Sequence, residues 1–139
     1  METAFYLGSP GDVEALDSLT VLVVDDERAV LDGLGELLES EGYRVATATD
    51  GQDALDQLRT GLRPCAILLD LMMPGMDGWD FRHEQTQDPN LSDIPVVIIT
   101  AVGFSEKSVK AQFGDIDFVP KPVPVDALLA AVRRRSTEC

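Results

Sequence analysis

Five polar side chains stand where apolar runs of the chain end. Asp25 and Asp26 follow TVLVV, Asp70 ends AILLD, Thr100 closes PVVIIT, and Lys121 follows DFVP. Clustered carboxylates repel one another, so a site that gathers three of them needs a cation, and oxygen ligands at this density suit Mg²⁺. A carboxylate such as Asp70 can form an acyl phosphate, while a hydroxyl and an ammonium group can bind phosphoryl oxygens. The residue types therefore indicate magnesium-dependent phosphoryl chemistry.

Each of these residues also has an ordinary structural interpretation. An aspartate after a strand often caps a helix, a threonine at a strand end has high β-propensity, and a lysine is usually a solvated charge. Asp70 is the sharpest case, because an ionised carboxylate at the end of an apolar run is costly unless it is paired or coordinated. The joint pattern favours a site, since unrelated caps would not supply five complementary groups in this order.

The pattern between these residues predicts strands alternating with helices. Strands are expected at 20–24, 43–49, 66–69, 95–100 and 117–119. Helices are expected between the first two strands, between Asp50 and Gly61, after Asp77, from about 105 to 113 and from 124 to 135. Short connections and continuous apolar strands are typical of a parallel sheet with helices on both faces. In such a sheet ligands bind at the carboxyl ends of the strands, so the five polar residues are expected at one edge.

The length and the net charge of the chain limit the number of domains and the kinds of binding partner. A chain of 139 residues suits one domain, predicted at 19–135, with a loosely ordered N-terminal extension at 1–18 and a tail at 136–139. The formal charge is −14, with 25 acidic and 11 basic residues, which argues against direct binding of nucleic acid. The basic run 133–135 is interpreted as favourable charge at a helix C-terminus. No apolar run is long enough for a membrane span and no signal peptide is recognisable, so we expect a cytoplasmic protein without a membrane partner.

Four segments together resemble the receiver domain of two-component response regulators, the CheY-like superfamily, over Leu19 to Arg135. They are VLVVDDE, ILLDLMMPGMDG, VVIITA and DFVPKP. The resemblance implies the flavodoxin-like α/β fold, a doubly wound (βα)5 sandwich with five parallel strands in the order 2-1-3-4-5 and helices on both faces.

The resemblance also implies a role for each site residue. Asp70 matches the phosphoryl-accepting aspartate. Mg²⁺, for which Mn²⁺ could substitute, would be held by Asp25, Asp26, Asp70 and the backbone carbonyl of Met72. The remaining matches are Thr100, Ala101 and Lys121 at phosphate-binding and switch positions, Phe118 as the aromatic that rotates inward, and Lys121-Pro122 as a cis peptide.

By the same resemblance, Asp70 takes its phosphoryl group from a phosphohistidine on a sensor histidine kinase or a histidine phosphotransfer protein. Phosphorylation then shifts a population between two conformations, which controls binding of a downstream protein or onward phosphotransfer. The chain is expected to be a stand-alone receiver and not an enzyme, apart from its own phosphorylation and slow autodephosphorylation. We expect a monomer, or a weak dimer through the face formed by 105–113, 117–119 and 124–135.

Three departures from the family pattern are visible. Phe118 stands where many members have tyrosine, and 100–114 is about one residue shorter than expected, which predicts a short or mobile helix there. Met72 and Val102 occupy the positions that influence hydrolysis of the acyl phosphate. Because apolar side chains cannot orient an attacking water, a persistent phosphoryl group is predicted.

Other functions fit less well. A phosphatase of the haloacid dehalogenase type needs a second acid two residues after the nucleophile, where this chain has Met72. An FMN-binding flavodoxin needs a phosphate loop after the first strand, where Asp25 and Asp26 would repel the phosphate. A receiver excised from a hybrid kinase or a transcription factor stays open. His83 is interpreted as a solvated surface histidine and Trp79 as packing near the site entrance.

Overall fold

Five parallel strands form the centre of the fold in the computed structural model, which describes residues 19–100, 106–114 and 116–136. The strands are β1 Thr20–Val24, β2 Arg44–Ala48, β3 Ala66–Asp70, β4 Val96–Thr100 and β5 Asp117–Pro120. Their order is β2-β1-β3-β4-β5, and every neighbouring pair is parallel. The predicted flavodoxin-like topology is confirmed.

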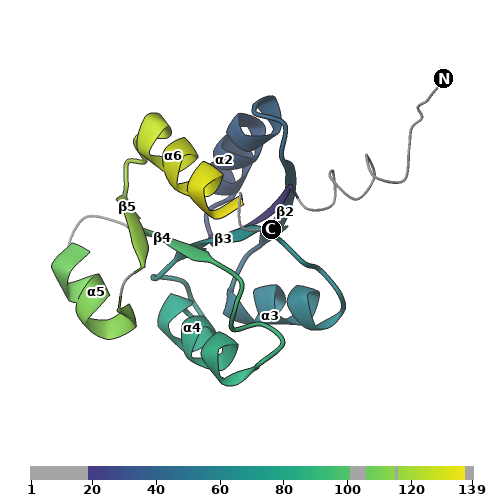
Figure 1. Cartoon of the computed structure of the whole chain (residues 1–139), viewed down its shortest axis with the longest axis vertical. Coiled ribbons are helices and arrows are strands. Elements are labelled where there is room, and N and C mark those ends of the chain that lie inside the picture. The colour runs from purple at the N-terminus through teal and green to yellow at the C-terminus, as the bar shows by residue number, and fades with distance from the viewer. Residues whose placement is uncertain (1–18, 101–105, 115, 137–139) are drawn as a thin grey trace.

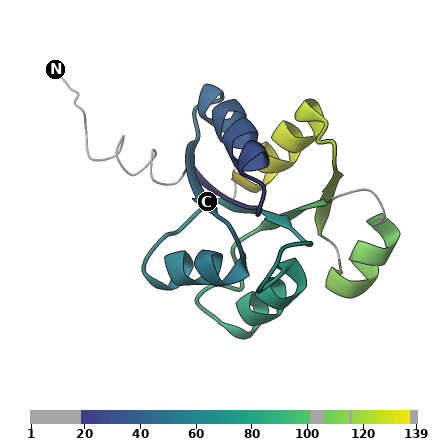
Figure 2. The same cartoon turned by 180° about the vertical axis from the view of Figure 1, so that it is seen from behind.

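Helices cover both faces of this sheet. Within the described ranges they are α2 Arg28–Ser40, α3 Gly51–Arg59, α4 Gly78–Gln87, α5 Glu106–Phe113 and α6 Val125–Ser136. Figure 1 shows α2 and α6 on one side of the strands and α3, α4 and α5 on the other, and the reverse view in Figure 2 agrees. The sandwich is therefore doubly wound, as the alternation of strands and helices predicted.

Two apolar cores, one on each face, explain why the central strands read as continuous apolar runs. Leu22, Ile67 and Ile98 belong to the core under α3, α4 and α5. Their neighbours along the same strands, such as Val23 and Leu68, belong to the core under α2 and α6. Because both faces of a parallel sheet are covered, strand residues of either parity must be apolar.

The element boundaries lie within one or two residues of those predicted, which is the usual uncertainty at fraying ends. Two caps fix the helices nearest the site. The Asp50 carboxylate accepts the Asp53 N–H at 2.8 Å to start α3, and the Asp77 carboxylate accepts the Asp80 N–H at 2.9 Å to start α4. The predicted extension at 1–18 and residues 137–139 lie outside the described ranges, while Ser136 belongs to α6.

Candidate functional site

Three carboxylates meet at the carboxyl ends of β1 and β3. β1 and β3 are paired in the sheet, with Val24 opposite Leu69, so Asp25 and Asp70 leave the two strands side by side. One carboxylate oxygen from each of Asp25, Asp26 and Asp70 lies within 4.8 Å of the others. Asp25 is completely buried and Asp70 is 3% exposed, whereas Asp26 faces solvent. This edge therefore concentrates negative charge in a place where water screens it poorly.

Lys121 brings a positive charge to the same edge. Its Nζ lies 2.7 Å from Asp25 Oδ2, and 3.4 Å from both Asp70 Oδ2 and Glu27 Oε1. The Lys121 N–H donates to the Thr100 carbonyl at 2.8 Å, so the lysine is held against the end of β4, and the Lys121-Pro122 peptide bond is cis. The ammonium group thus contacts two of the three clustered carboxylates.

The single positive charge of Lys121 does not balance the negative charges of the clustered carboxylates. Burial raises the pKa of the Asp70 carboxyl; the charge of Asp25 adds to this effect, and the Met72 N–H and Lys121 oppose it without cancelling it. Burial alone would lower the pKa of Lys121, but its hydrogen bond to Asp25 and the charges of Asp25 and Asp70 raise it overall. One ammonium group is firmly protonated here, yet it does not fully offset the neighbouring carboxylates.

The loop after β3 packs tightly behind Asp70. Asp70 Oδ1 accepts the Met72 N–H at 3.2 Å, while the Met72 side chain is 56% exposed. The Gly78 N–H donates to the Leu71 carbonyl at 3.1 Å. A Cβ at Gly78 would overlap the Asp70 carbonyl oxygen, so only glycine allows α4 to start this close to β3. The start of α4 is therefore fixed to the backbone of Asp70.

Thr100 and Phe118 lie on the neighbouring strands. Thr100, the last residue of β4, is fully buried, and its hydroxyl has no hydrogen-bond partner among the described residues. Phe118, in β5, is half-buried and packs against the core under α3, α4 and α5. Ala101 and Val102 lie outside the described residues.

This arrangement fits an oxygen-binding cation. The three carboxylates supply hard anionic oxygens, and the Met72 carbonyl follows Asp70 by two residues. Mg²⁺ favours such oxygen ligands and retains several waters, which the exposed position of Asp26 permits. The acidic cluster could therefore hold a divalent metal ion, and the Lys121 ammonium group contacts two of its carboxylates, those of Asp25 and Asp70.

Comparison with known proteins identifies the family. The family model of the response regulator receiver domain matches residues 21–133. The chain belongs to this family. It is a receiver domain of two-component signalling, and the resemblance seen in its sequence is confirmed.

Relatives of the receiver align with most of its length. Response regulator MprA of Mycolicibacterium vanbaalenii is 39% identical over 121 residues, which is 84% of this chain and 51% of the relative. MprA of Mycobacterium bovis is 38% identical over 117 residues, which is 84% of this chain and 50% of that protein. The receiver thus spans about half the length of the curated relatives it matches.

Solved structures agree with the fold of the receiver. The signal receiver domain of a signal transduction histidine kinase from Syntrophus aciditrophicus aligns with a TM-score of 0.76 at 28% identity, covering 86% of this chain and 90% of that one. The chemotaxis protein CheY4 of Vibrio cholerae aligns with a TM-score of 0.73 at 26% identity, covering 83% and 96%. Within the part of the receiver that the structure describes, every helix is too short or too polar to span a membrane.

The structure adds one residue to the site and places two others. Glu27, which approaches Lys121, was not singled out from the sequence, although it is the third acid in succession after β1. His83 is exposed on α4. Trp79 stacks on Phe113 of α5 with ring centroids 4.6 Å apart and an angle of 9° between the planes, and it also packs against the core of that face.

Proposed function

We propose that Asp70 of this receiver accepts a phosphoryl group from a phosphohistidine in a Mg²⁺-dependent reaction. The observation that carries the proposal is the convergence of Asp25, Asp26 and Asp70 at one sheet edge, with the Lys121 ammonium group in contact with Asp70. If these residues were only helix caps or solvated charges, each would interact with its own helix or with water. Their convergence at one edge of the sheet would then have no cause.

The residues have distinct tasks in the transfer. An Asp70 carboxylate oxygen attacks the phosphorus of the donor, so that an O–P bond forms while the N–P bond breaks and its electron pair returns to the imidazole nitrogen. Lys121 stabilises the negative charge of the transferring phosphoryl oxygens. When bound by Asp25, Asp26, Asp70 and the Met72 carbonyl, Mg²⁺, or Mn²⁺ in its place, would neutralise charge on the carboxylate and phosphoryl oxygens.

The donor that we propose is a sensor histidine kinase or a histidine phosphotransfer protein. An apolar hollow of about 230 Å³ supports a protein donor. It lies beside the site, because Lys121 lines it together with Ala29, Val30, Gly33, Leu34, Pro122 and Val123. An apolar surface of the donor that covered this hollow would bring its phosphohistidine close to Lys121 and hence to Asp70.

We further propose that the transferred group changes the conformation around Thr100. Its buried hydroxyl lacks a partner within the described residues and would donate to a phosphoryl oxygen on Asp70. Ala101 would donate its N–H to the same group, and Phe118, half-buried and without a hydroxyl of its own, would become more buried. The output surface is then α5, β5 and α6, through which the receiver would bind a downstream protein or form a weak dimer.

We also propose how and where the receiver acts. Its output is binding of a downstream protein or onward phosphotransfer, with no catalytic activity beyond its own phosphorylation and slow dephosphorylation. It acts in the cytoplasm, and the strong net negative charge disfavours direct contact with nucleic acid.

The test is an intact-mass measurement after incubation with acetyl phosphate and Mg²⁺. The wild-type chain should gain one phosphoryl mass, and Asp70→Asn should gain none. Asp93→Asn is the matched control, because Asp93 is exposed and lies outside the acidic cluster, and it should label like the wild type. An unlabelled wild-type protein, or equal labelling of Asp70→Asn, would exclude Asp70 as the acceptor.

A further inference from the structure

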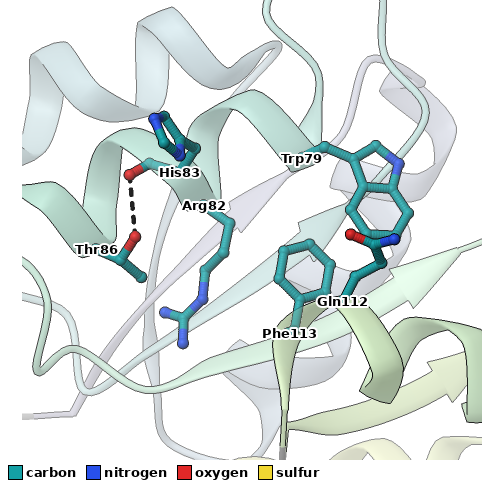
Figure 3. Close-up of a pocket in the computed structure, with 6 residues that line it drawn as sticks. All are labelled: Trp79, Arg82, His83, Thr86, Gln112 and Phe113. Atoms are coloured by element: carbon teal, nitrogen blue, oxygen red, sulfur yellow. Dashed lines mark hydrogen bonds between the residues drawn. The ribbon is translucent and has the colours of Figure 1, made fainter.

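A cavity of about 300 Å³ lies between α4 and α5 and shares no lining residue with the acidic cluster. Six residues line it: Trp79, Arg82, His83 and Thr86 from α4, and Gln112 and Phe113 from α5. Figure 3 shows the two aromatic rings together on one side of Arg82, with His83 and Thr86 on the other. The Thr86 hydroxyl donates to the His83 carbonyl at 3.0 Å, which leaves its oxygen lone pairs as acceptors.

The aromatic pair gives this cavity a rigid apolar wall. Trp79 and Phe113 are stacked almost parallel, with ring centroids 4.6 Å apart. Both residues also pack against the core of this face of the sheet, so neither ring is a freely rotating surface side chain. A flat apolar group placed in the cavity would therefore meet a preformed surface, and little side-chain entropy would be lost on binding.

Arg82 is a positively charged residue of the cavity lining, and no carboxylate of the described residues pairs with it. Its guanidinium group is half-buried, and among the residues that the structure describes it forms no ion pair; its one hydrogen bond is to Gln85 Oε1, at 2.8 Å. This is unexpected in a chain with 25 acidic and 11 basic residues. Burial lowers the pKa of Arg82, and no neighbouring carboxylate counters that effect. A partly desolvated guanidinium with unused N–H donors favours an anion from outside the chain.

Gln85 holds the guanidinium group in place. The Gln85 side chain is fully buried, and its amide nitrogen donates to the carbonyls of Leu91 and Ile94, each at 3.0 Å. Its oxygen is thereby directed at Arg82. Since the donors of Gln85 are fixed by the loop before β4, Arg82 is oriented before any ligand arrives, as a binding group should be.

Arg82 also borders a second hollow, but that hollow suits an anion less well. It is lined by Arg82, Ser92, Asp93, Ile94, Pro95, Val96, Ile116 and Arg135. The carboxylate of Asp93 would repel an anion there, and Arg135 is already paired with Asp117 at 2.7 Å. The cavity between α4 and α5 has no acidic residue in its lining and has the aromatic wall.

We propose that the cavity between α4 and α5 binds a small organic carboxylate with an aromatic body. The carboxylate pairs with the N–H groups of Arg82, and the ring lies against the wall formed by Trp79 and Phe113. Thr86 and Gln112 offer hydrogen bonds to polar substituents. The volume is at the lower end of that of small-molecule sites, roughly 300 to 1,000 Å³, so a compound with a single ring is the expected size. This site does not depend on phosphorylation of Asp70.

Benzoate is the probe for this site, and Trp79 supplies the signal because it is the only tryptophan of the chain. Titration of the 139-residue chain with benzoate at physiological salt should change the tryptophan emission saturably. Acetate lacks the ring and benzyl alcohol lacks the charge, so each should bind at least tenfold more weakly. Inorganic phosphate tests a simple anion site and should also bind more weakly than benzoate.

Variants locate the binding on Arg82. Hydrogen bonds to a charged group contribute about 1.5–3 kcal/mol, so Arg82→Gln should raise the Kd for benzoate about tenfold or more. Because this change also removes the contact with Gln85, a second variant keeps Arg82. Thr86→Glu places a competing carboxylate in the same cavity lining and should abolish binding, whereas Thr86→Gln, of equal length but without the charge, should weaken binding much less. Arg28→Gln removes an exposed positive charge from α2 and should leave the Kd unchanged.

Three results would overturn the proposal. The first is the absence of a saturable emission change with benzoate. The second is binding of benzyl alcohol or phosphate as tight as that of benzoate, since one half of the proposed recognition would then be missing. The third is an unchanged Kd in Thr86→Glu.

Discussion

At the scale of single residues, the closest contact of Lys121 is with Asp25 and not with Asp70. The two Nζ to oxygen distances are 2.7 Å and 3.4 Å. The pKa of Asp70 stays raised, mainly because of burial, so its carboxylate is not held in a strong ion pair. The proposed role of Asp70 as a nucleophile is consistent with this arrangement, since no strong ion pair has to be broken before the carboxylate reacts.

The buried hydroxyl of Thr100 is predicted to lower the stability of the unphosphorylated domain. It is buried without a hydrogen-bond partner among the described residues, so Thr100→Val should raise the free energy of unfolding by about 1 kcal/mol, the desolvation cost removed with the hydroxyl. Urea denaturation monitored by circular dichroism measures this change. Thr47→Val, the same substitution at an exposed residue of β2, is the matched control and should change the stability little. A loss of stability in Thr100→Val would show that the hydroxyl has a partner after all.

The exposed side chain of Met72 is predicted to prolong the life of the phosphoryl group. It is 56% exposed two residues after Asp70, where a polar side chain could orient an attacking water. Met72→Gln should therefore speed the loss of phosphoryl mass several-fold after acetyl phosphate is removed, whereas Met72→Leu should not. Equal rates in the Gln and Leu variants would mean that this side chain does not control hydrolysis.

At the scale of elements, Asp117 ties the start of β5 to the end of α6. Its carboxylate accepts hydrogen bonds from Arg134 at 2.9 Å and from Arg135 at 2.7 Å. Burial alone would raise the pKa of Asp117, but the two arginines outweigh burial and lower it. Because β5 and α6 belong to the proposed output surface, this link fixes the relative position of two of its three elements.

The lowered pKa of Asp117 makes its contribution to stability dependent on pH. A carboxyl group with a lower pKa in the folded than in the unfolded state stabilises the fold above its unfolded pKa, and the gain is lost as pH falls through the folded pKa. Asp117→Asn should thus lower the free energy of unfolding by about 1 kcal/mol at pH 7, a modest value because Arg134 is largely exposed. The difference from wild type should shrink from about pH 4 downward.

The measurement for Asp117→Asn is urea denaturation of both proteins at a series of pH values. Asp56→Asn is the matched control, because Asp56 is exposed on α3 and forms no ion pair among the described residues. A difference between Asp117→Asn and wild type that stays constant down to pH 2 would contradict the assignment to the Asp117 carboxylate.

The sequence predicts elements better than it predicts contacts. Val23 and Leu68 lie in apolar runs that only a covered parallel strand explains, and parallel strands place their carboxyl ends at one edge, so the meeting of Asp25 with Asp70 was foreseeable. The preference of Lys121 for Asp25 was not, since it depends on side-chain positions across β1, β3 and β5. Burial of the Gln85 amide beneath Arg82 likewise results from tertiary packing, which leaves no periodic signal in the sequence.

At the scale of the whole molecule, charge and topology act together. The chain carries a formal charge of −14, and the sheet collects three of its carboxylates at one edge within 4.8 Å. Mutual repulsion at that edge destabilises the fold, and one ammonium group offsets it only in part. Any cation that binds the cluster in the folded state should therefore stabilise the whole domain through linkage.

Mg²⁺ is predicted to stabilise the domain beyond the effect of ionic strength. At a Mg²⁺ concentration about ten times its Kd, linkage gives about 1.4 kcal/mol of added free energy of unfolding. Thermal or urea denaturation with MgCl₂, compared with NaCl at equal ionic strength, measures the specific part. Asp26→Asn removes the exposed ligand while leaving the buried pair of Asp25 and Lys121 intact, so it should weaken the Mg²⁺ effect and keep the NaCl effect. An equal rise in both salts, or an unchanged Mg²⁺ effect in Asp26→Asn, would mean that the acidic cluster does not bind the metal ion.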